Sequence, residues 1–514
     1  MLKYRRIITS ITVGIIFTVA ACVAPSTNSL KKGGQRQVLE TAFKNINLLH
    51  ATEISARTIS LAGLEAVSKT DILLKIDTRQ TAIALTHEDL IIGEWSTPAD
   101  NDHDGWAALV ADALERARKA NPKLGEQGHN LVLARFFRGA LSKFDRYTRY
   151  ATPAQARNTR ARREGFGGLG ISIRYHRDNA YIAKVHDGTP AFKAGLKSGD
   201  RITHVGATAL TGLTQNAAIE YLRGPIHSKA DLTVIRKDIP APLKISVVRA
   251  HIILPTVTSK WEGGILTIRL SGFNQGTSRS LGKVLTAAER DNSKPLRGIV
   301  LDLRNNPGGL LDQAVAVADF FLNDGRIIST SGRHHRANQI FNATWSERVT
   351  RTPITILVNG RSASASEIVA AALRDRGRAI VIGASSFGKG SVQTIIRLSN
   401  GGELTLTWAH MIAPSGFSLQ SHGIIPAICT SENEDELASM MAAIRSDLPA
   451  AGTILNAALA SRYAIRNSPD LARERCPPTR SERREDSEIA KYFLEHRSLY
   501  RRAIRDGSAT IAER

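Results

Sequence analysis

Residues 354–397 read ITILVNGRSASASEIVAAALRDRGRAIVIGASSFGKGSVQTIIR, and this stretch decides how the rest of the chain is interpreted. Its first part, Ile354–Val358, is apolar and rich in β-branched residues, which predicts a buried strand. After an Asn-Gly-Arg turn, an alanine-rich segment predicts a helix over about 364–377. Two further strands, Ala379–Ile382 and Val392–Leu398, are predicted on either side of a glycine-rich loop.

Two kinds of reactive side chain lie in the predicted turns of this stretch. Ser362, Ser364 and Ser366 gather where a strand gives way to a helix N-terminus, and one lysine, Lys389, lies in the glycine loop. A serine hydroxyl becomes a nucleophile when a neighbour takes its proton, and a lysine can do this once burial or a positive field lowers its pKa. The pattern indicates a serine nucleophile with a lysine base, and leaves the choice among the three serines open.

These residues also nearly match the motifs of two other kinds of site. Gly383, Gly388 and Lys389 fall one residue short of a phosphate-binding P-loop. Gly390 stands where that motif needs Ser or Thr, and a strand is expected where it needs a helix. The second alternative is an esterase triad, whose nearest downstream histidine, His410, lies in a strand-like run with no acid placed to orient it.

The composition indicates a folded chain of several domains. At 514 residues, about two to four domains are expected. The net charge of +22 is spread among acidic residues without a continuous basic stripe, so no nucleic-acid partner is expected. A solvated basic surface is the simpler interpretation, and contact with anionic lipid or lipopolysaccharide head groups is the functional one.

Residues 1–21 predict a lipoprotein signal peptide. The apolar run Ile7–Ala20 follows a basic start and is short for a membrane span. Small residues directly before Cys22 resemble a bacterial lipobox, which implies cleavage there, a lipid on the thiol and a place in the periplasm; the alternative is an ordinary signal peptide with a chance cysteine. Val23, in place of aspartate, favours the outer membrane. With Cys22 acylated, Cys429 and Cys476 remain as a candidate disulfide.

The rest of the chain changes character at recognisable points. Residues 22–37 are polar and suit a tether. Residues 38–164 are expected to be mainly helical, and 165–250 switch to short β runs with glycine turns. Residues 251–430 alternate strands and helices, and residues 431–514 predict a helical C-terminal extension. The fold class expected is therefore multidomain, α+β and α/β.

Residues 165–250 resemble a PDZ domain. Gly168-Leu169-Gly170-Ile171 matches the loop that binds a terminal carboxylate, and Thr189-Pro190-Ala191 through Gly199-Asp200 matches a second signature of that domain. Successive amides in a glycine loop form a nest for an anion, and an adjacent strand edge accepts an added peptide strand. The resemblance therefore implies a binding site for peptide C-termini.

Three motifs, spaced in order around this domain, resemble the carboxy-terminal processing peptidases, also called tail-specific proteases. They are DLRNNPGG at 302–309, SASASE at 362–367 and FGKGSVQ at 387–393, and the resemblance runs over roughly 130–428. Members of this family are endopeptidases with a PDZ domain and a Ser/Lys dyad. The resemblance implies an α/β catalytic core of the crotonase or ClpP-like type, and no metal or cofactor.

The resemblance also assigns roles to single residues. Ser364 corresponds to the nucleophile, Lys389 to the general base and Gln393 to the residue that holds the lysine amine. The oxyanion hole corresponds to the backbone N–H of Ala365 and one N–H from the Gly308-Gly309 loop. This fits the physical argument, because amides at a helix N-terminus stabilise a developing oxyanion.

Two departures from the family pattern are visible. Residues 144–150 resemble its LDPYSxY motif with Arg146 in place of proline, and Ala427 replaces an aspartate near the end of the core. Both changes are expected to affect regulation rather than catalysis.

Together these features predict a periplasmic, lipid-anchored serine endopeptidase whose PDZ domain captures exposed or unfolded C-terminal tails. Its expected partners are protein or peptide substrates and, through the lipid, a membrane; an adaptor lipoprotein is a further candidate. The alternative is a non-catalytic PDZ scaffold on a peptidase fold.

Overall fold

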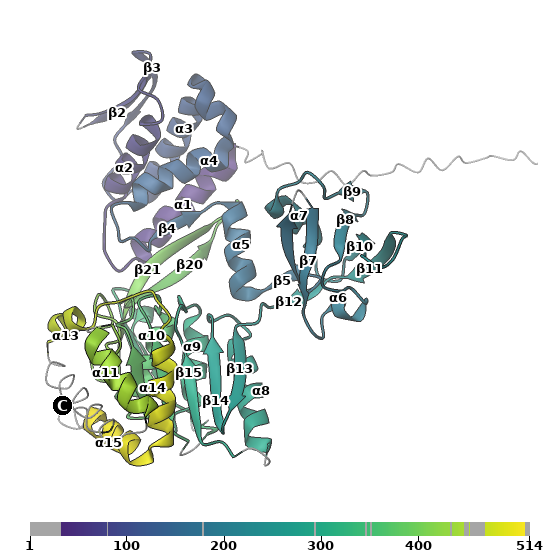
Figure 1. The fold of residues 1–514 in the computed structure, drawn as a ribbon. Coiled ribbons are helices and arrows are strands. Elements are labelled where there is room, and N and C mark those ends of the chain that lie inside the picture. The colour runs from purple at the N-terminus through teal and green to yellow at the C-terminus, as the bar shows by residue number, and fades with distance from the viewer. Residues whose placement is uncertain are drawn as a thin grey trace, which may run out of the picture.

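The computed structural model describes residues 32–79, 81–176, 179–291, 295–344, 347–349, 352–431, 434–446, 452 and 468–508. The predicted signal peptide and Cys22 lie outside these residues. A helical N-terminal bundle, a small domain of β-strands and an α/β core follow one another along the chain (Figure 1). The mixed, multidomain fold class is confirmed. Among the described residues, no helix combines the length and the apolar composition that crossing a membrane requires.

The N-terminal bundle packs around large apolar side chains that are fully buried, among them Phe43, Trp106 and Phe136. Its helices are α1 (Lys32–Leu49), α2 (Ala56–Ser68), α3 (His103–Ala120) and α4 (Pro122–Leu141). The boundary between α3 and α4 follows from Asn121-Pro122, because proline has no N–H to continue α3 and the Asn121 side chain caps α4. An antiparallel sheet that the sequence did not predict lies beside the bundle, in the order β1 (Leu74–Thr78), β2 (Ala82–His87), β3 (Leu90–Ser96).

The second domain is a twisted antiparallel sheet with two short helices. Its strands run in the order β11 (Leu243–Val248), β10 (Lys229–Ile235), β8 (Arg201–Val205), β7 (Asn179–Val185), β6 (Ile171–His176), with β9 (Thr208–Ala209) beside β8. The helices are α6 (Pro190–Lys193) and α7 (Gln215–Leu222). The chain enters after α5 (Pro153–Glu164) through β5 (Phe166–Gly168) and leaves through β12 (Ala250–Ile252), and these two strands pair with each other.

The core is built on a six-stranded sheet that is parallel except at one edge. Its order is β13 (Val257–Glu262), β14 (Ile265–Leu270), β15 (Gly298–Asp302), β18 (Ile354–Val358), β19 (Ala379–Gly383), β22 (Ile428–Cys429), with β13 antiparallel to β14. Every residue of β15, β18 and β19 is buried. Such continuous burial is typical of strands covered on both faces, which explains their unbroken apolar sequences.

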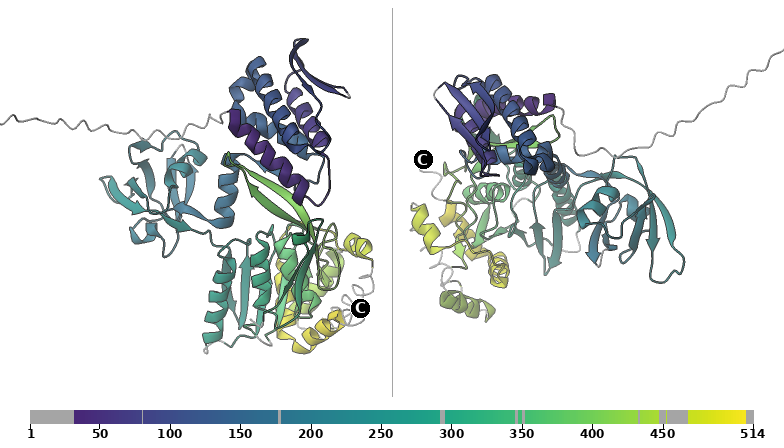
Figure 2. Two further views of the ribbon diagram at one scale, coloured as in Figure 1. Left: turned by 180° about the vertical axis from the view of Figure 1, so that it is seen from behind. Right: turned by 90° about the horizontal axis from the view of Figure 1, so that it is seen from above.

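The two faces of this sheet belong to different layers. Alternate residues such as Ile299 and Ile356 pack against α8 (Thr277–Arg290), α9 (Leu311–Asp319) and α10 (Ala365–Asp375). Their neighbours, such as Val300 and Leu357, pack against C-terminal helices, and Figures 1 and 2 show these helices against the sheet. The helices are α11 (Glu434–Arg445), α14 (Arg484–Glu495) and α15 (Arg497–Ser508).

A long β-hairpin connects the core with the N-terminal bundle (Figure 1). It consists of β20 (Ser391–Arg397) and β21 (Glu403–Ile412), and β21 also pairs with β4 (Arg149–Ala151) and β16 (Arg326–Ser331), which carries β17 (Gln339–Asn342) at its other edge. Leu404 and Leu406 at one end belong to the core of the bundle. Ala409 and Met411 at the other end belong to the hydrophobic core of the α/β domain. The two domains therefore share this hairpin.

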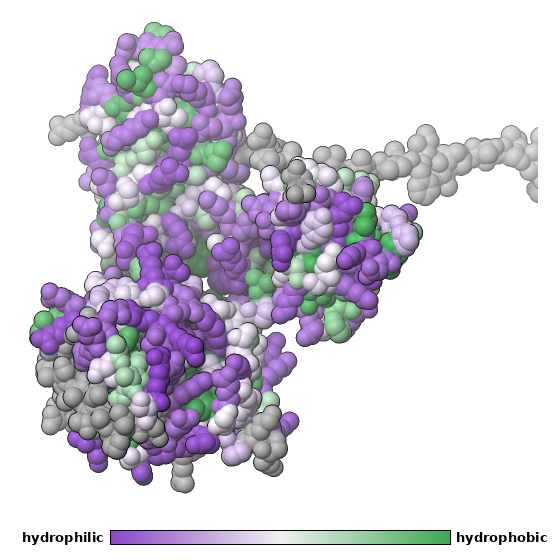
Figure 3. Space-filling view, in the orientation of Figure 1, coloured by the Kyte–Doolittle hydropathy of each residue, from purple (hydrophilic) through white to green (hydrophobic). Residues whose placement is uncertain are grey.

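Hydrophilic side chains cover most of the face drawn in Figure 3, and apolar ones form small separate groups. Many basic side chains pair with acids, as Arg116 does with Asp112 and Arg445 with Glu488.

Candidate active site

Ser364 lies at the turn between β18 and α10 in a backbone conformation that is unusual for a residue with a side chain. Its φ is 57° and its ψ is −113°, and its side chain is buried. A non-glycine residue persists in this region only where the surrounding structure holds it, and such residues gather at functional sites. The strand-to-helix turn that carries the nucleophilic serine of α/β-hydrolases is also strained.

The other two serines of the cluster fasten this turn to the loop after β15. The Ser362 hydroxyl donates to the Leu303 carbonyl at 2.9 Å. The Ser366 hydroxyl donates to the Asn306 carbonyl at 2.7 Å. Both side chains are completely buried and bonded to backbone carbonyls, so they stabilise the turn. This difference separates Ser364 from its neighbours, a choice that sequence patterns alone left open.

Glu367, in the first turn of α10, joins the serine turn to the lysine loop. Its carboxylate is completely buried and accepts four hydrogen bonds. One oxygen accepts from the Ser386 hydroxyl at 2.5 Å and the Gly388 amide at 2.7 Å. The other accepts from the amides of Ser364 at 2.6 Å and Lys389 at 3.0 Å. Burial raises the pKa of Glu367, and the four donors oppose that shift.

Lys389 is a cation in a largely buried place. Burial lowers its pKa from 10.5 to about 8, and the positive charge of Arg149 adds to this effect. The carboxylates of Glu367 and Asp145 act in the opposite direction. Its Nζ lies 4.9 Å from the centre of the Tyr147 ring, where the ring face attracts a positive charge. A lysine with this pKa is partly neutral near pH 8, as a general base must be.

Gln393 lies on β20, and its amide nitrogen donates to Ser391 Oγ at 2.9 Å and Thr407 Oγ1 at 3.3 Å. Among the hydrogen bonds of the described residues, none joins Lys389 Nζ to Gln393 or to Ser364 Oγ. The role of Gln393 in holding the lysine amine therefore stays a prediction, and the structure gives it a place in the β20–β21 hairpin.

Asp145 is a residue near the site that sequence reasoning missed. It accepts from the amide of Tyr147 at 2.7 Å and from the hydroxyl of Thr407 at 3.1 Å, and its other oxygen lies 3.5 Å from His50 Nε2. Burial acts against ionisation, but these hydrogen bonds hold the pKa of Asp145 well below its usual range. The ionised carboxylate thus fixes the turn that presents Tyr147 to Lys389.

The segment around Asp145 was visible in the sequence only as a family motif of an accessory region. Arg146 was expected to affect regulation more than catalysis, and its guanidinium lies 5.0 Å from the centre of the Tyr147 ring and 5.1 Å from that of Phe387. Phe387 precedes Lys389 by two residues. The signal available in advance was the motif itself, but only the fold shows that it reaches the lysine loop.

The loop after β15 passes directly beside Ser364. A Cβ atom added to Gly308, whose φ is +96°, would lie 2.6 Å from the Ala363 carbonyl oxygen and 2.9 Å from the Ala365 nitrogen, so only glycine fits. The Gly308 amide donates to Asn306 Oδ1 at 2.9 Å. Within the described residues, no backbone hydrogen bond occupies the Ala365 or Gly309 amides. Of the residues expected in the oxyanion hole, these two retain free donors.

The structure does not favour His410 as a base or a P-loop at the lysine loop. His410 is exposed on β21, opposite Ser391 in the register of the hairpin. β20 begins at Ser391, where a P-loop would begin a helix. In the part of the chain that the structure describes, no group of three or more His, Cys, Asp or Glu side chains is arranged to hold a metal ion.

The loop of the second domain that is predicted to bind a carboxylate contains a glycine in a conformation that other residues rarely adopt. Gly170 has a φ of +85°, and a Cβ atom there would lie 2.2 Å from the Thr189 side chain. The Leu169 carbonyl accepts from the Ala191 amide at 2.9 Å. The strand that follows, β6, is an edge strand of its sheet. An extended peptide can therefore be added along β6 next to the glycine loop.

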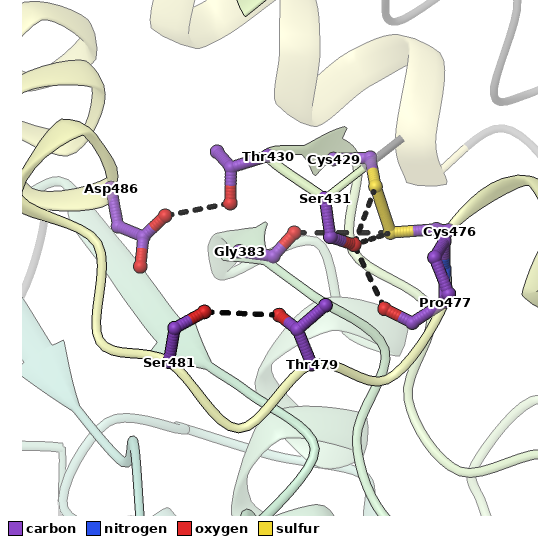
Figure 4. The surroundings of a disulfide bond; sticks show 9 residues. All are labelled: Gly383, Cys429, Thr430, Ser431, Cys476, Pro477, Thr479, Ser481 and Asp486. Carbon is purple, nitrogen blue, oxygen red and sulfur yellow. Dashed lines mark hydrogen bonds between the residues drawn. A yellow bond between two sulfur atoms is a disulfide. The ribbon is translucent and has the colours of Figure 1, made fainter. Parts of the chain in front are cut away.

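A disulfide joins Cys429, at the end of β22, to Cys476, which directly follows α13 (Pro469–Arg475) (Figure 4). The hydroxyl of Ser431 lies beside both sulfur atoms and donates to the Pro477 carbonyl at 2.8 Å. The bond attaches the C-terminal segment to the edge of the core sheet.

Comparison with known proteins identifies the family. Residues 264–430 match the model of peptidase family S41, and residues 167–247 match that of the PDZ domain. The chain is 38% identical over 347 residues to a carboxy-terminal-processing protease of Bartonella bacilliformis, which covers 67% of this chain and 80% of that protein. It is 33% identical over 287 residues to a probable CtpA-like serine protease of Staphylococcus aureus, covering 55% of this chain and 57% of that protein.

Similar chains are also found among solved structures. The photosystem II D1 C-terminal processing protease is 22% identical, covers 76% of this chain and 92% of its own, and gives a TM-score of 0.37. The PDZ domain of a carboxy-terminal protease from Vibrio cholerae in complex with peptide is 26% identical over 17% of this chain and 98% of its own, with a TM-score of 0.16.

The catalytic core, the PDZ domain and the sequence relatives define a class, that of PDZ-bearing serine proteases. The chain belongs to the family of carboxy-terminal-processing proteases, within peptidase family S41.

The hydrogen bonds of Glu367 give a direct prediction. Glu367→Gln replaces one acceptor oxygen with an NH₂ group that faces hydrogen-bond donors, so the serine turn and the lysine loop should lose their common anchor. Because a misplacement of about 1 Å can cost about 10²-fold in rate, kcat should fall at least about 100-fold. Proteolysis of an unfolded substrate measures this, with exposed Glu289→Gln on α8 as the control. Full activity in Glu367→Gln would show that the carboxylate is dispensable.

Proposed function

We propose that this protease cleaves polypeptides with a dyad of Ser364 and Lys389, and that it works in the periplasm, anchored by a lipid on Cys22. The observation that supports the dyad is that Ser364 and Lys389 both donate to the Glu367 carboxylate. One of its oxygens accepts from the backbone amide of a strained, buried serine and from that of a lysine with a lowered pKa. Serine and lysine placed in this way suit nucleophilic catalysis.

In the proposed first half-reaction, the neutral amine of Lys389 takes the proton of Ser364 Oγ as this oxygen attacks the scissile carbonyl carbon. The carbonyl oxygen becomes an oxyanion, which would accept from the amides of Ala365 and Gly309, since neither has a backbone partner among the described residues. When the tetrahedral intermediate collapses, the C–N bond breaks and the Lys389 ammonium gives its proton to the leaving amine. The N-terminal part of the substrate remains on Ser364 as an ester.

In the second half-reaction, water attacks the ester carbonyl and Lys389 again accepts the proton. Collapse of this second intermediate releases the new carboxylate and restores the Ser364 hydroxyl with the proton from Lys389. Both halves need the same neutral amine, so one base serves the whole cycle.

Substrate capture is assigned to the PDZ domain. The terminal carboxylate of a tail would bind the amides of the 168–171 loop, and the residues before it would pair with the free edge of β6. Strand addition needs an extended segment, which favours unfolded or exposed C-termini. Such tails are the substrates that we propose, with an adaptor lipoprotein as a candidate partner at the membrane.

The dyad is tested by substitution. Ser364→Ala removes the nucleophile and Lys389→Ala the base, so each should abolish cleavage of an unfolded protein, with a loss of about 10⁶-fold for the serine by analogy with other serine proteases. His410→Ala should keep full activity, and a C-terminal tail peptide should still bind Ser364→Ala. Turnover by purified Ser364→Ala, measured by mass spectrometry of the products, would overturn the assignment.

The pKa of Lys389 gives the pH dependence. Below about pH 8 the amine is mostly protonated and inactive as a base, and above it mostly neutral. With a single group of this pKa, kcat/KM should rise about tenfold between about pH 7 and pH 9. Initial rates in buffers of constant ionic strength check this, and a flat profile over that range would contradict the role of Lys389.

The anchor is tested separately. Cys22→Ser removes the thiol that would carry the lipid, so the protein should move from the membrane fraction to the soluble periplasmic fraction of cells. Its cleavage of a soluble unfolded substrate should be unchanged. A wild-type protein that already fractionates as soluble would contradict the lipid anchor.

A further inference from the structure

The C-terminal extension contacts the active-site loops, although the sequence showed no chemistry in it. Residues 473–486, here called the strap, cross the carboxyl ends of the parallel strands. The Gly360 amide in the serine turn donates to the Thr479 carbonyl at 2.7 Å. In the loop after β15, Arg304 donates to the Arg483 carbonyl at 2.7 Å. The strap therefore touches the loops that follow both β15 and β18.

At its start the strap binds the lysine loop through Arg473. One nitrogen of this guanidinium donates to the carbonyls of Ser386 at 2.8 Å and His422 at 2.6 Å. The other donates to the Phe387 carbonyl at 3.3 Å. The planar guanidinium is suited to such a set of acceptors, because it presents several donors in fixed directions, whereas a lysine ammonium is a point charge on a flexible stem.

Arg473 and Glu367 hold the lysine loop by different groups. Glu367 accepts from the amides of Gly388 and Lys389. Arg473 donates to the carbonyls of Ser386 and Phe387, the two residues before them. The peptides leading into Lys389 are thus fixed by a carboxylate at their N–H groups and by a guanidinium at their C=O groups.

The disulfide determines where Arg473 lies. Arg473 is in the last turn of α13, three residues before Cys476, and α13 has only seven residues. A helix of this length has little stability of its own and depends on its attachments. The disulfide to Cys429 ties its C-terminal end to the edge strand β22 of the core sheet.

We propose that Arg473 is a positioning residue for Lys389, and that the Cys429–Cys476 disulfide keeps it in place. The strap then acts through the lysine loop, and the substrate does not touch Arg473. This inference rests on the proposed function, because it assumes that Lys389 is the base. It goes further in giving the C-terminal extension a part in catalysis.

The test compares Arg473→Ala with Arg475→Ala in the full mature chain. Arg475 lies in the same turn of α13 and is exposed. For Arg473→Ala we expect kcat to fall about 10- to 100-fold, with KM and the affinity of a tail peptide unchanged, and the pH midpoint of kcat/KM to move. For Arg475→Ala we expect wild-type values. Loss of general stability alone would not move the pH midpoint.

A second variant keeps the test decisive if Arg473→Ala unfolds. Arg473→Lys retains the charge but cannot span three carbonyls, so it should fold and show a smaller loss of kcat in the same direction. A kcat within twofold of wild type in either folded variant overturns the proposal. Ser364→Ala and Lys389→Ala are assayed alongside. If they are inactive while Arg473→Ala is fully active, the positioning role fails and the dyad stands; if they retain turnover, the dyad itself fails.

The disulfide is tested with the pair Cys429→Ser and Cys476→Ser combined. This variant should lose kcat in the same direction as Arg473→Ala. When all three substitutions are combined, the losses should not multiply, because they act through the same contact. Losses that multiply independently would overturn the link between the disulfide and Arg473.

Discussion

The carboxylate of Glu367 accepts hydrogen bonds from the backbone of both Ser364 and Lys389, residues that belong to different loops. A buried carboxylate is costly unless its oxygens are fully paired, and here four donors surround it. The two loops must therefore adopt matching positions for the core to be stable at all. The hydrogen bonds that offset the cost of burying Glu367 also fix the position of the serine turn relative to the lysine loop. Stable folding and alignment of the site therefore depend on the same contacts.

One hairpin likewise serves two domains where the N-terminal bundle meets the α/β core. The β20–β21 hairpin contributes Leu404 and Leu406 to one hydrophobic core and Ala409 and Met411 to another. β20 directly follows the lysine loop, so the hydrogen-bonded hairpin connects the N-terminal bundle with the site. Asp145 adds a second path, because the turn that it fixes places Tyr147 against Lys389. The N-terminal bundle thus lies next to the candidate active site, although no motif in its helices indicates this.

The sequence was informative where the determining contacts are local. Ile354–Val358 was predicted residue for residue, and α10 and β19 within about two residues, because apolar periodicity and turn residues are properties of short segments. The PDZ domain and the family were recognised from motifs. Partners distant in the chain were missed. Glu367 appeared only as the last residue of the SASASE motif, and Tyr147 and Arg473 meet the lysine loop only through the fold. The sheet β1–β3 was missed because its short strands lie among strongly helical segments.

The order of layers in the core has a consequence for how the protein folds during synthesis. α14 and α15 cover one face of the parallel sheet, and the strap joins the loops of the site, and all three follow those loops in the chain. A chain that lacks them has an open apolar face and unsupported loops, whatever the state of its PDZ domain. The site is therefore completed only after the strap and these helices have been synthesised, so a copy cut before the strap would lose structural support rather than a separate regulatory part.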